Sequence, residues 1–163
     1  MAELLFITPE EMTETTIIGG NVDVDKYTMC ILNTQIRVIE PLLGSLLYTK
    51  IKTSLENDDL TGLYLKLFNE FIKPITKFES CADYIAISPY TLTNAGLYKN
   101  SPENVTIVEQ KEVEGLSERY SSIAQMYVNR FNKWIGLNEL EEYKIFQDEV
   151  DAQNININNS WRF

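Results

Sequence analysis

The feature that most constrains the fold of this chain is a pair of long apolar stripes with helical spacing, each containing one internal proline. The first stripe consists of Met29, Leu32, Ile36, Ile39, Leu43 and Leu46 and continues through Leu47, Ile51 and Leu55. The second consists of Leu60, Leu63, Leu67, Phe71, Ile75 and Phe78, widened by Tyr64, Phe68 and Ile72. A proline inside a helix removes a hydrogen-bond donor and crowds the carbonyl four residues earlier, so we expect a kink or restart at Pro41 and at Pro74. Two long helices bent at matching places predict a packed helical hairpin.

A third stripe, rich in aromatic residues, predicts a long helix over residues 112–135. Its members are Val113, Leu116, Tyr120, Ile123, Tyr127, Phe131 and Trp134. We assign this stripe to core packing, because an apolar face of this period is what a helix buries. Gly136 is expected to end the helix. Leu140, Tyr143, Ile145 and Phe146 predict a shorter element after it.

The acidic run Glu56-Asn57-Asp58-Asp59 lies between the first two stripes. Asp and Asn are favoured N-caps, so we expect Asp58 or Asp59 to begin the second helix. The alternative is a Ca²⁺ or Mg²⁺ site built from oxygen ligands, but the run lacks the spacing of an EF-hand loop. Carboxylates also gather at residues 139–142, where a solvated helix face is the simpler interpretation. We predict no metal site.

Residues 88–108 have the composition of a β-hairpin or projecting loop. Tyr90 opens a β-like run, Asn94 and Gly96 supply turn residues that tolerate positive φ, and Tyr98 lies in a possible return strand. A further β-like run occupies residues 105–108. We treat the four named residues as a projecting loop available to a partner.

The last ten residues, 154–163, are almost uncharged in an otherwise acidic chain. In an extended strand Ile155 and Ile157 would share one side, and such a strand can add to a partner's sheet edge or lie in a groove. Trp161 and Phe163 are suitable anchors for pockets, and Arg162 could reach an acidic site on a partner. We therefore predict a docking arm; the alternative is a tail that folds back on its own helices.

These patterns predict a mainly α protein: a bundle of long, Pro-kinked antiparallel helices with a short β-hairpin or loop insertion and an extended C-terminal tail. A lead-in is expected at residues 1–22, with one short helix capped by Thr8 and begun by Pro9. The helical domain is expected at residues 23–149, with the hairpin at about 88–108. Residues 150–163 form the expected extended docking arm.

Composition restricts the possible functions. The 24 acidic and 14 basic residues give a formal net charge of −10, which disfavours general attraction to nucleic acid. Histidine is absent, which removes the commonest general base and metal ligand. No phosphate-binding or nucleophile motif occurs, so we predict neither an enzyme nor a cofactor. Cys30 and Cys81 lie in apolar helical patterns and are expected to be buried thiols. No signal peptide or membrane span is predicted.

Residues 33–51, NTQIRVIEPLLGSLLYTKI, resemble the first core helix of the head–tail connector (adaptor) proteins of tailed bacteriophages. The shared features are a Gln, a Pro-apolar-Leu-Gly group and a following Leu-Tyr. Here they are Gln35, Pro41, Leu42, Leu43, Gly44, Leu47 and Tyr48. The proline-containing second helix, the TLTNAGLY segment at 91–98 and the aromatic helix at 112–135 follow in the same order. The resemblance covers about residues 23–135 and is closest to connectors of crAss-like and other Bacteroidetes phages.

The resemblance implies a structural virion protein made in the host cytoplasm. Such proteins form a neck ring, usually a dodecamer, that binds under the portal, extends the DNA channel and presents a surface to the next ring or tail protein. DNA would pass through without sequence-specific binding, and no membrane would be involved. From a different class, the alternative is a soluble cytosolic helical module or regulator that binds another protein. A connector predicts a ring; a regulator predicts a monomer or dimer with a dissociable partner.

Overall fold

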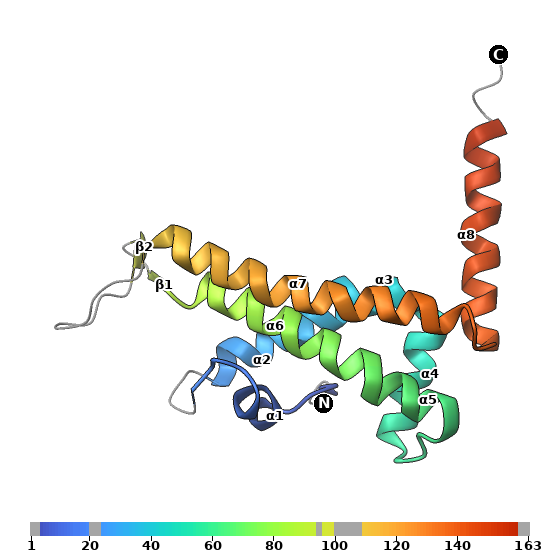
Figure 1. The fold of residues 1–163 in the computed structure, drawn as a ribbon, viewed down its shortest axis with the longest axis horizontal. Coiled ribbons are helices and arrows are strands. Elements are labelled where there is room, and N and C mark those ends of the chain that lie inside the picture. Colours follow the sequence, from blue (N-terminus) through green and yellow to red (C-terminus); the bar gives the residue numbers. More distant parts are fainter. Residues whose placement is uncertain (1–3, 20–23, 94–95, 100–108, 160–163) are drawn as a thin grey trace.

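The computed structural model describes residues 4–19, 24–93, 96–99 and 109–159, and the protein is mainly α-helical (Figure 1). The α-helices are α1 (Pro9–Glu14), α2 (Val24–Thr34), α3 (Glu40–Leu43), α4 (Ser45–Glu56), α5 (Gly62–Leu67), α6 (Lys73–Ile87), α7 (Gln110–Ile135) and α8 (Glu141–Asn159). Two π-helical turns, η1 (Gln35–Ile39) and η2 (Phe68–Ile72), join α2 to α3 and α5 to α6. Two short strands, β1 (Tyr90–Thr93) and β2 (Gly96–Lys99), lie between α6 and α7.

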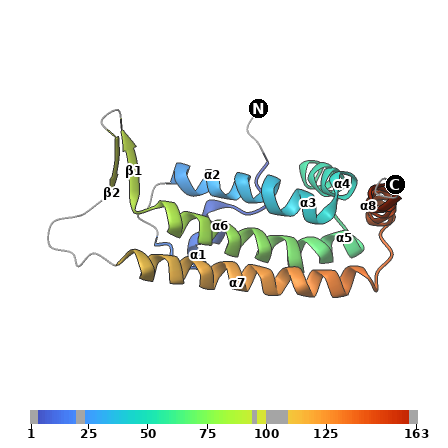
Figure 2. The ribbon, with the colours of Figure 1, turned by 90° about the horizontal axis from the view of Figure 1, so that it is seen from above.

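Three rows of helix form an elongated body. Figure 2 shows α2 with α3, then α6, then α7 running alongside one another, whereas α4 and α8 are viewed nearly end-on and therefore run nearly perpendicular to these rows. The two ends of the body each carry a projecting element, with β1 and β2 at one end and α8 at the other (Figure 1).

Both internal prolines follow directly on a π-helical turn. Pro41 is the second residue of α3, after η1, and Pro74 is the second residue of α6, after η2. A π turn inserts one extra residue into the helix, and this places the ring of each proline in a first-turn position, where its missing N–H is tolerated. The predicted disturbance at each proline is therefore present as a local widening of the helix.

The extra residue of η1 also corrects the predicted first stripe. Met29 and Ile36 are 50% and 54% exposed, respectively, although an unbroken α-helix ending in buried Ile39 and Leu43 would bury them. One inserted residue rotates the preceding helix by about 100°, so Ile31 and Gln35 are buried instead. Leu46 and Leu63 are likewise exposed, whereas Leu67, Phe71 and Ile75 are buried as predicted.

Two changes of direction separate the first helical row from the second. Gly44 adopts φ +74°, a region that strongly favours glycine, and ends α3 before α4 begins. At the far end of α4, Asp58 also has positive φ, and the N–H groups of Asp58 and Asp59 bond to the carbonyls of Leu55 and Ser54 at 3.3 and 3.0 Å. This is a helix C-terminal motif. The acidic run therefore closes α4, and the prediction that it caps the second helix is wrong; α5 begins after Thr61.

The lead-in is part of the core. Thr8 caps α1 in a reciprocal capping box with Glu11, as the sequence pattern predicts. One buried cluster contains Phe6, Ile39, Leu43, Leu47, Tyr48, Ile51, Leu67, Phe68, Phe71, Ile72, Ile75, Phe131, Ile135 and Leu140. The second contains Ile7, Met12, Ile18, Tyr27, Cys30, Ile31, Cys81, Tyr84 and Ile85. Because the lead-in supplies side chains to both clusters, it packs as one body with the helices.

Residues 150–159 are helical, and the predicted extended conformation of this segment is wrong. They continue α8 from Glu141 without a break to Asn159. A two-residue Ile alternation is too short to select a strand when a helix already precedes it, because each added helical residue gains a backbone hydrogen bond without a new nucleation cost. Trp161, Arg162 and Phe163, as well as the β-like run at 105–108, lie outside the described residues.

Candidate protein-docking site

The residues of the connector-like motif gather where the body meets α8. Leu43 and Tyr48 are buried in the larger core cluster, and Gly44 lies between them at the break between α3 and α4. Pro41 is on the exposed side of α3. The motif therefore builds the support from which α8 projects, rather than a cleft.

Gln35 ties the lead-in to this support. Its side chain is buried, and its Oε1 accepts a hydrogen bond from the N–H of Phe6 at 2.7 Å. Its Nε2 donates to the carbonyl oxygen of Leu4 at 3.0 Å. One amide thus satisfies a backbone donor and a backbone acceptor two residues apart, in a segment outside the helices. The sequence pattern singled out Gln35 but did not indicate this partner, which is 29 residues away.

Phe146 of α8 lies directly on Gly44. An ideal Cβ at Gly44 would come within 2.6 Å of Cδ2 and 2.8 Å of Cβ of Phe146. Two features therefore require glycine at this position: its backbone conformation and the close approach of the Phe146 ring.

Two further contacts hold the base of α8. Tyr143 packs edge-on against Phe131 of α7, with ring centroids 5.8 Å apart, and also contacts the Phe146 ring. The hydroxyl of Tyr64 in α5 donates to the Glu142 carboxylate at 2.8 Å. Burial, this hydrogen bond and the charges of Glu142 and Glu141 raise the pKa of Tyr64 to about 12. The sequence pattern places these residues in separate elements and does not indicate the joint that they form.

From this joint α8 stands away from the body (Figure 1). Ile155 and Ile157 lie in its distal part and therefore share a helix with the base rather than a strand. At the opposite end, β1 and β2 pair antiparallel, with Tyr90 opposite Lys99, Thr91 opposite Tyr98 and Thr93 opposite Gly96. Asn94 lies outside the described residues. The two predicted partner-binding regions are thus placed at opposite ends of the molecule.

Among the described residues, no group of three or more Asp, Glu, Cys or His side chains is arranged to hold a metal ion. Cys30 and Cys81 are buried, and burial raises the pKa of both thiols to about 11, so they are poor nucleophiles near neutral pH. Within the same ranges of the chain, no helix is both long and apolar enough to cross a membrane.

Fold and site together define a mainly helical protein with a projecting C-terminal helix anchored on a glycine-containing joint. The chain belongs to DUF6712, a family of unknown function, whose family model matches residues 39–150. This range contains both residues of the Gly44–Phe146 contact. No curated protein and no solved structure gives a significant match.

Proposed function

We propose that this protein is a structural virion component: a subunit of a head–tail connector ring that binds under the phage portal and provides a surface for the next ring or tail protein. The single observation that carries the proposal is the order of connector-like motifs, from the Gln35–Tyr48 group to the aromatic helix α7. Portal protein, neighbouring copies and the adjoining neck component are its partners in this proposal.

The arrangement of projecting elements supports this assignment. A closed ring is built from heterologous contacts, in which one patch meets a different patch on the next copy. An elongated body with β1 and β2 at one end and α8 at the other offers separate elements for such contacts (Figure 1). In this proposal, Trp161 and Phe163 anchor the arm on a neighbour or on the portal.

The acidic composition is compatible with a DNA channel. With a formal net charge of −10, the surface has little general attraction for phosphates, so DNA could slide past without being held. At physiological salt the repulsion acts only over about 8 Å, so it would not prevent passage.

The test is purification of the tagged full-length protein from phage-infected cells, with identification of the co-purifying proteins and electron microscopy of the eluate. Co-purification of portal protein, together with ring-shaped or particle-bound density, supports the proposal. A monomer or dimer that brings down only host or regulatory proteins overturns it and favours the helical binding module.

Removal of residues 154–163 tests the arm separately. We expect the truncated protein to fold, with unchanged thermal unfolding of the body, but to be missing from particles. Normal incorporation of the truncated chain would show that this segment is not the docking arm.

A further inference from the structure

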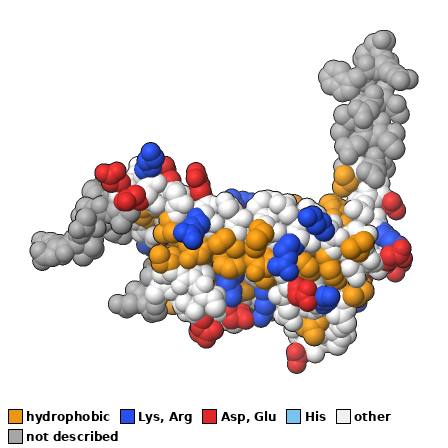
Figure 3. Space-filling model, in the orientation of Figure 1, with side chains coloured by type: hydrophobic (Ala, Val, Ile, Leu, Met, Phe, Trp, Pro, Cys, Tyr) orange, Lys and Arg blue, Asp and Glu red, His pale blue; other side chains and the backbone are white. Residues whose placement is uncertain are grey.

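The outer face of the C-terminal half of α7 differs in charge from the rest of the protein. Residues 119–138 contain no Asp or Glu, but include Arg119, Arg130 and Lys133, in a chain of net charge −10. On the face shown in Figure 3, Lys and Arg accompany an apolar band along the middle of the body, whereas Asp and Glu lie mainly around its margins.

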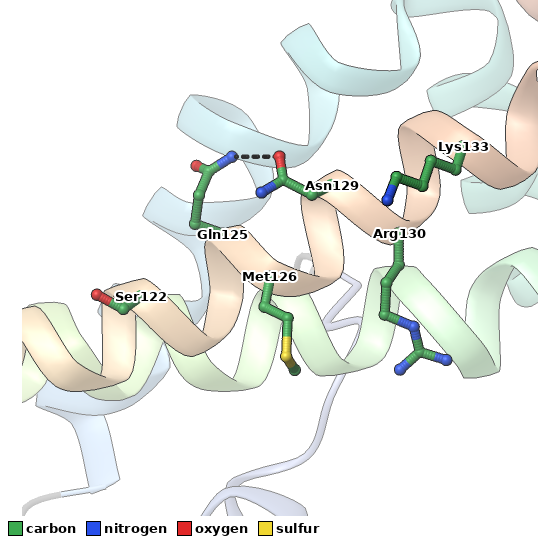
Figure 4. Close-up of a pocket in the computed structure, with 6 residues that line it drawn as sticks. All are labelled: Ser122, Gln125, Met126, Asn129, Arg130 and Lys133. Carbon is green, nitrogen blue, oxygen red and sulfur yellow. Dashed lines mark hydrogen bonds between the residues drawn. The ribbon is translucent and has the colours of Figure 1, made fainter.

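Six residues at helical spacing line a shallow groove on this face of α7: Ser122, Gln125, Met126, Asn129, Arg130 and Lys133 (Figure 4). We call these residues the α7 groove. Met126 is 48% exposed and places an apolar side chain in the middle of these polar residues. Arg130 lies over the Tyr127 ring at 5.3 Å from its centroid and is thereby held beside the groove. The groove spans three helical turns, or about 16 Å.

The exposed side of α8 carries more acidic than basic side chains, in contrast to the α7 groove. Phe146 and Tyr143 face the body, as their ring contacts show. On the opposite side of the helix lie Glu141, Lys144, Ile145 and Asp148, which we call the α8 outer face. Ile145 is 41% exposed, and Lys144 is paired with Glu139 at 3.0 Å. The α8 outer face therefore presents an apolar residue flanked by carboxylates.

From this complementarity we infer that the α8 outer face of one copy docks in the α7 groove of a second copy. In an antiparallel pairing of the two helices, Ile145 would meet Met126 and Glu141 would meet Arg130, because the members of each pair are four residues apart on both helices. Asp148 and Lys133 add to the opposite charges of the two faces. Because Phe146 and Tyr143 face Gly44 and Phe131 of the same copy, the α8 outer face points away from its own α7, and a neighbouring molecule is the available occupant. The contact joins different patches on the two copies and can therefore propagate around a ring. This inference rests on the proposed function only in assigning the contact to a ring.

A nucleic-acid ligand fits the groove less well. Phosphate recognition is built from several clustered cations, whereas the α7 groove has two, with an apolar methionine between its polar ends. An apolar centre with a charged margin is the arrangement found in protein interfaces.

Site-specific cross-linking tests the contact directly. Full-length Met126→Cys and Ile145→Cys proteins are mixed and oxidised, and the linked species are identified by non-reducing electrophoresis and mass spectrometry. We expect a heterodimer joined through residues 126 and 145, several times more abundant than the product of a control mixture of Met126→Cys with Leu63→Cys. Leu63 is similarly exposed, at 43%, but lies on α5. The native cysteines are buried and should not compete. Equal yields from the two mixtures would overturn the inference.

Charge exchange provides an independent measurement by sedimentation velocity at low salt. The Arg130→Glu/Lys133→Glu and Glu141→Lys/Asp148→Lys proteins should each lose self-association by about tenfold or more, because like charges would then meet. An equimolar mixture should recover it, since every contact between unlike copies is again complementary. Lys66→Glu/Lys111→Glu, with the same change in net charge on exposed residues outside the groove, should associate like the wild type. Three results would contradict the contact. They are loss of self-association in this control, no recovery of self-association on mixing, and duplex DNA binding that depends on Arg130 and Lys133.

The outcomes separate this contact from the proposed function. If wild-type protein joins rings with portal but residues 126 and 145 do not link above the control, the interface is wrong and the connector function stands. If they link but portal protein does not co-purify, the interface stands and the connector function falls.

Discussion

The ring of Phe146 in α8 rests on the bare α-carbon of Gly44, the residue at which α3 gives way to α4. Gly44 has φ +74°, and a Cβ there would lie within 2.6 Å of the Phe146 ring. A residue of the connector-like motif is thus in direct contact with the helix that we propose for docking.

Gly44→Ala should destabilise the protein and displace α8. The backbone of Gly44, with φ +74° and ψ 155°, lies in a region essentially restricted to glycine and costs an alanine about 1–3 kcal/mol. The contact with Phe146 adds to this, so we expect the free energy of unfolding in urea to fall by about 2 kcal/mol or more. Gly115→Ala is the matched control, because Gly115 lies in α7 and a Cβ there would have no atom within 4 Å beyond its own helix backbone. That change should stabilise the protein by about 0.5–1 kcal/mol. Equal effects of the two substitutions would contradict the contact.

Gln35→Leu should release the lead-in. It leaves the buried N–H of Phe6 and the carbonyl of Leu4 without their shared partner, at a cost of about 1–3 kcal/mol for each group that stays buried. We expect faster hydrogen exchange at the Phe6 amide and a lower urea midpoint. Gln125→Leu, at an exposed position in α7, should leave both unchanged; retained protection of Phe6 in Gln35→Leu would show that other contacts hold the lead-in.

Tyr64→Phe should loosen the base of α8 and change the alkaline stability. The folded-state pKa of Tyr64 is raised to about 12 from 10.0, mainly by burial and by the bond to Glu142. A raised pKa gives stability that is fully present below pH 10 and is lost as the pH rises through about 12. Wild-type stability should therefore fall over that window more steeply than that of Tyr64→Phe. Parallel pH profiles of the two proteins would rule out this linkage.

Glu11→Gln should remove an acid-sensitive contribution to stability. Burial alone would raise the pKa of Glu11, but the hydrogen bond and charge of Lys73, with Nζ 2.7 Å from Oε1, together with the Thr8 N–H, lower it below 4.5. A lowered pKa gives stability that is present above pH 4.5 and is lost as the pH falls through the folded value. Both side chains are about one third exposed, so we expect less than about 1 kcal/mol. Thermal unfolding at pH 3 and pH 7 should show a smaller difference for Glu11→Gln than for the wild type.

Cys30 and Cys81 should report on opening of the fold. Both are buried with a pKa of about 11, so a maleimide or disulfide reagent should label them slowly at pH 8. Gly44→Ala should accelerate labelling in proportion to its loss of stability, because reaction requires opening of the structure. Rapid, complete labelling of the folded wild type would contradict the burial of these thiols.

The sequence by itself determined where most of the helices lie, but neither the break at Gly44 nor the continuation of α8 to Asn159. The α7 stripe is the clearest case, because periodic apolar residues without an internal proline specify one inward side. Phe131 is fully buried, and most other members of the stripe are half-buried against the two core clusters. The Thr8–Pro9 cap of α1 and the disturbances at Pro41 and Pro74 were also predictable, since they depend on groups within a few residues of one another.

Only the tertiary structure decided which face of α2 is buried, what Gln35 binds and what occupies the space over Gly44. The π turn of η1 shifts the buried face by one residue, and no apolar pattern records that insertion in advance. Gln35 and Phe6 are in contact although they lie 29 residues apart in the chain. Gly44 and Phe146 are in contact although they lie about 100 residues apart. Contacts of this kind depend on how the helices cross, and the energy that selects the crossing comes from packing distant side chains together rather than from local backbone preference.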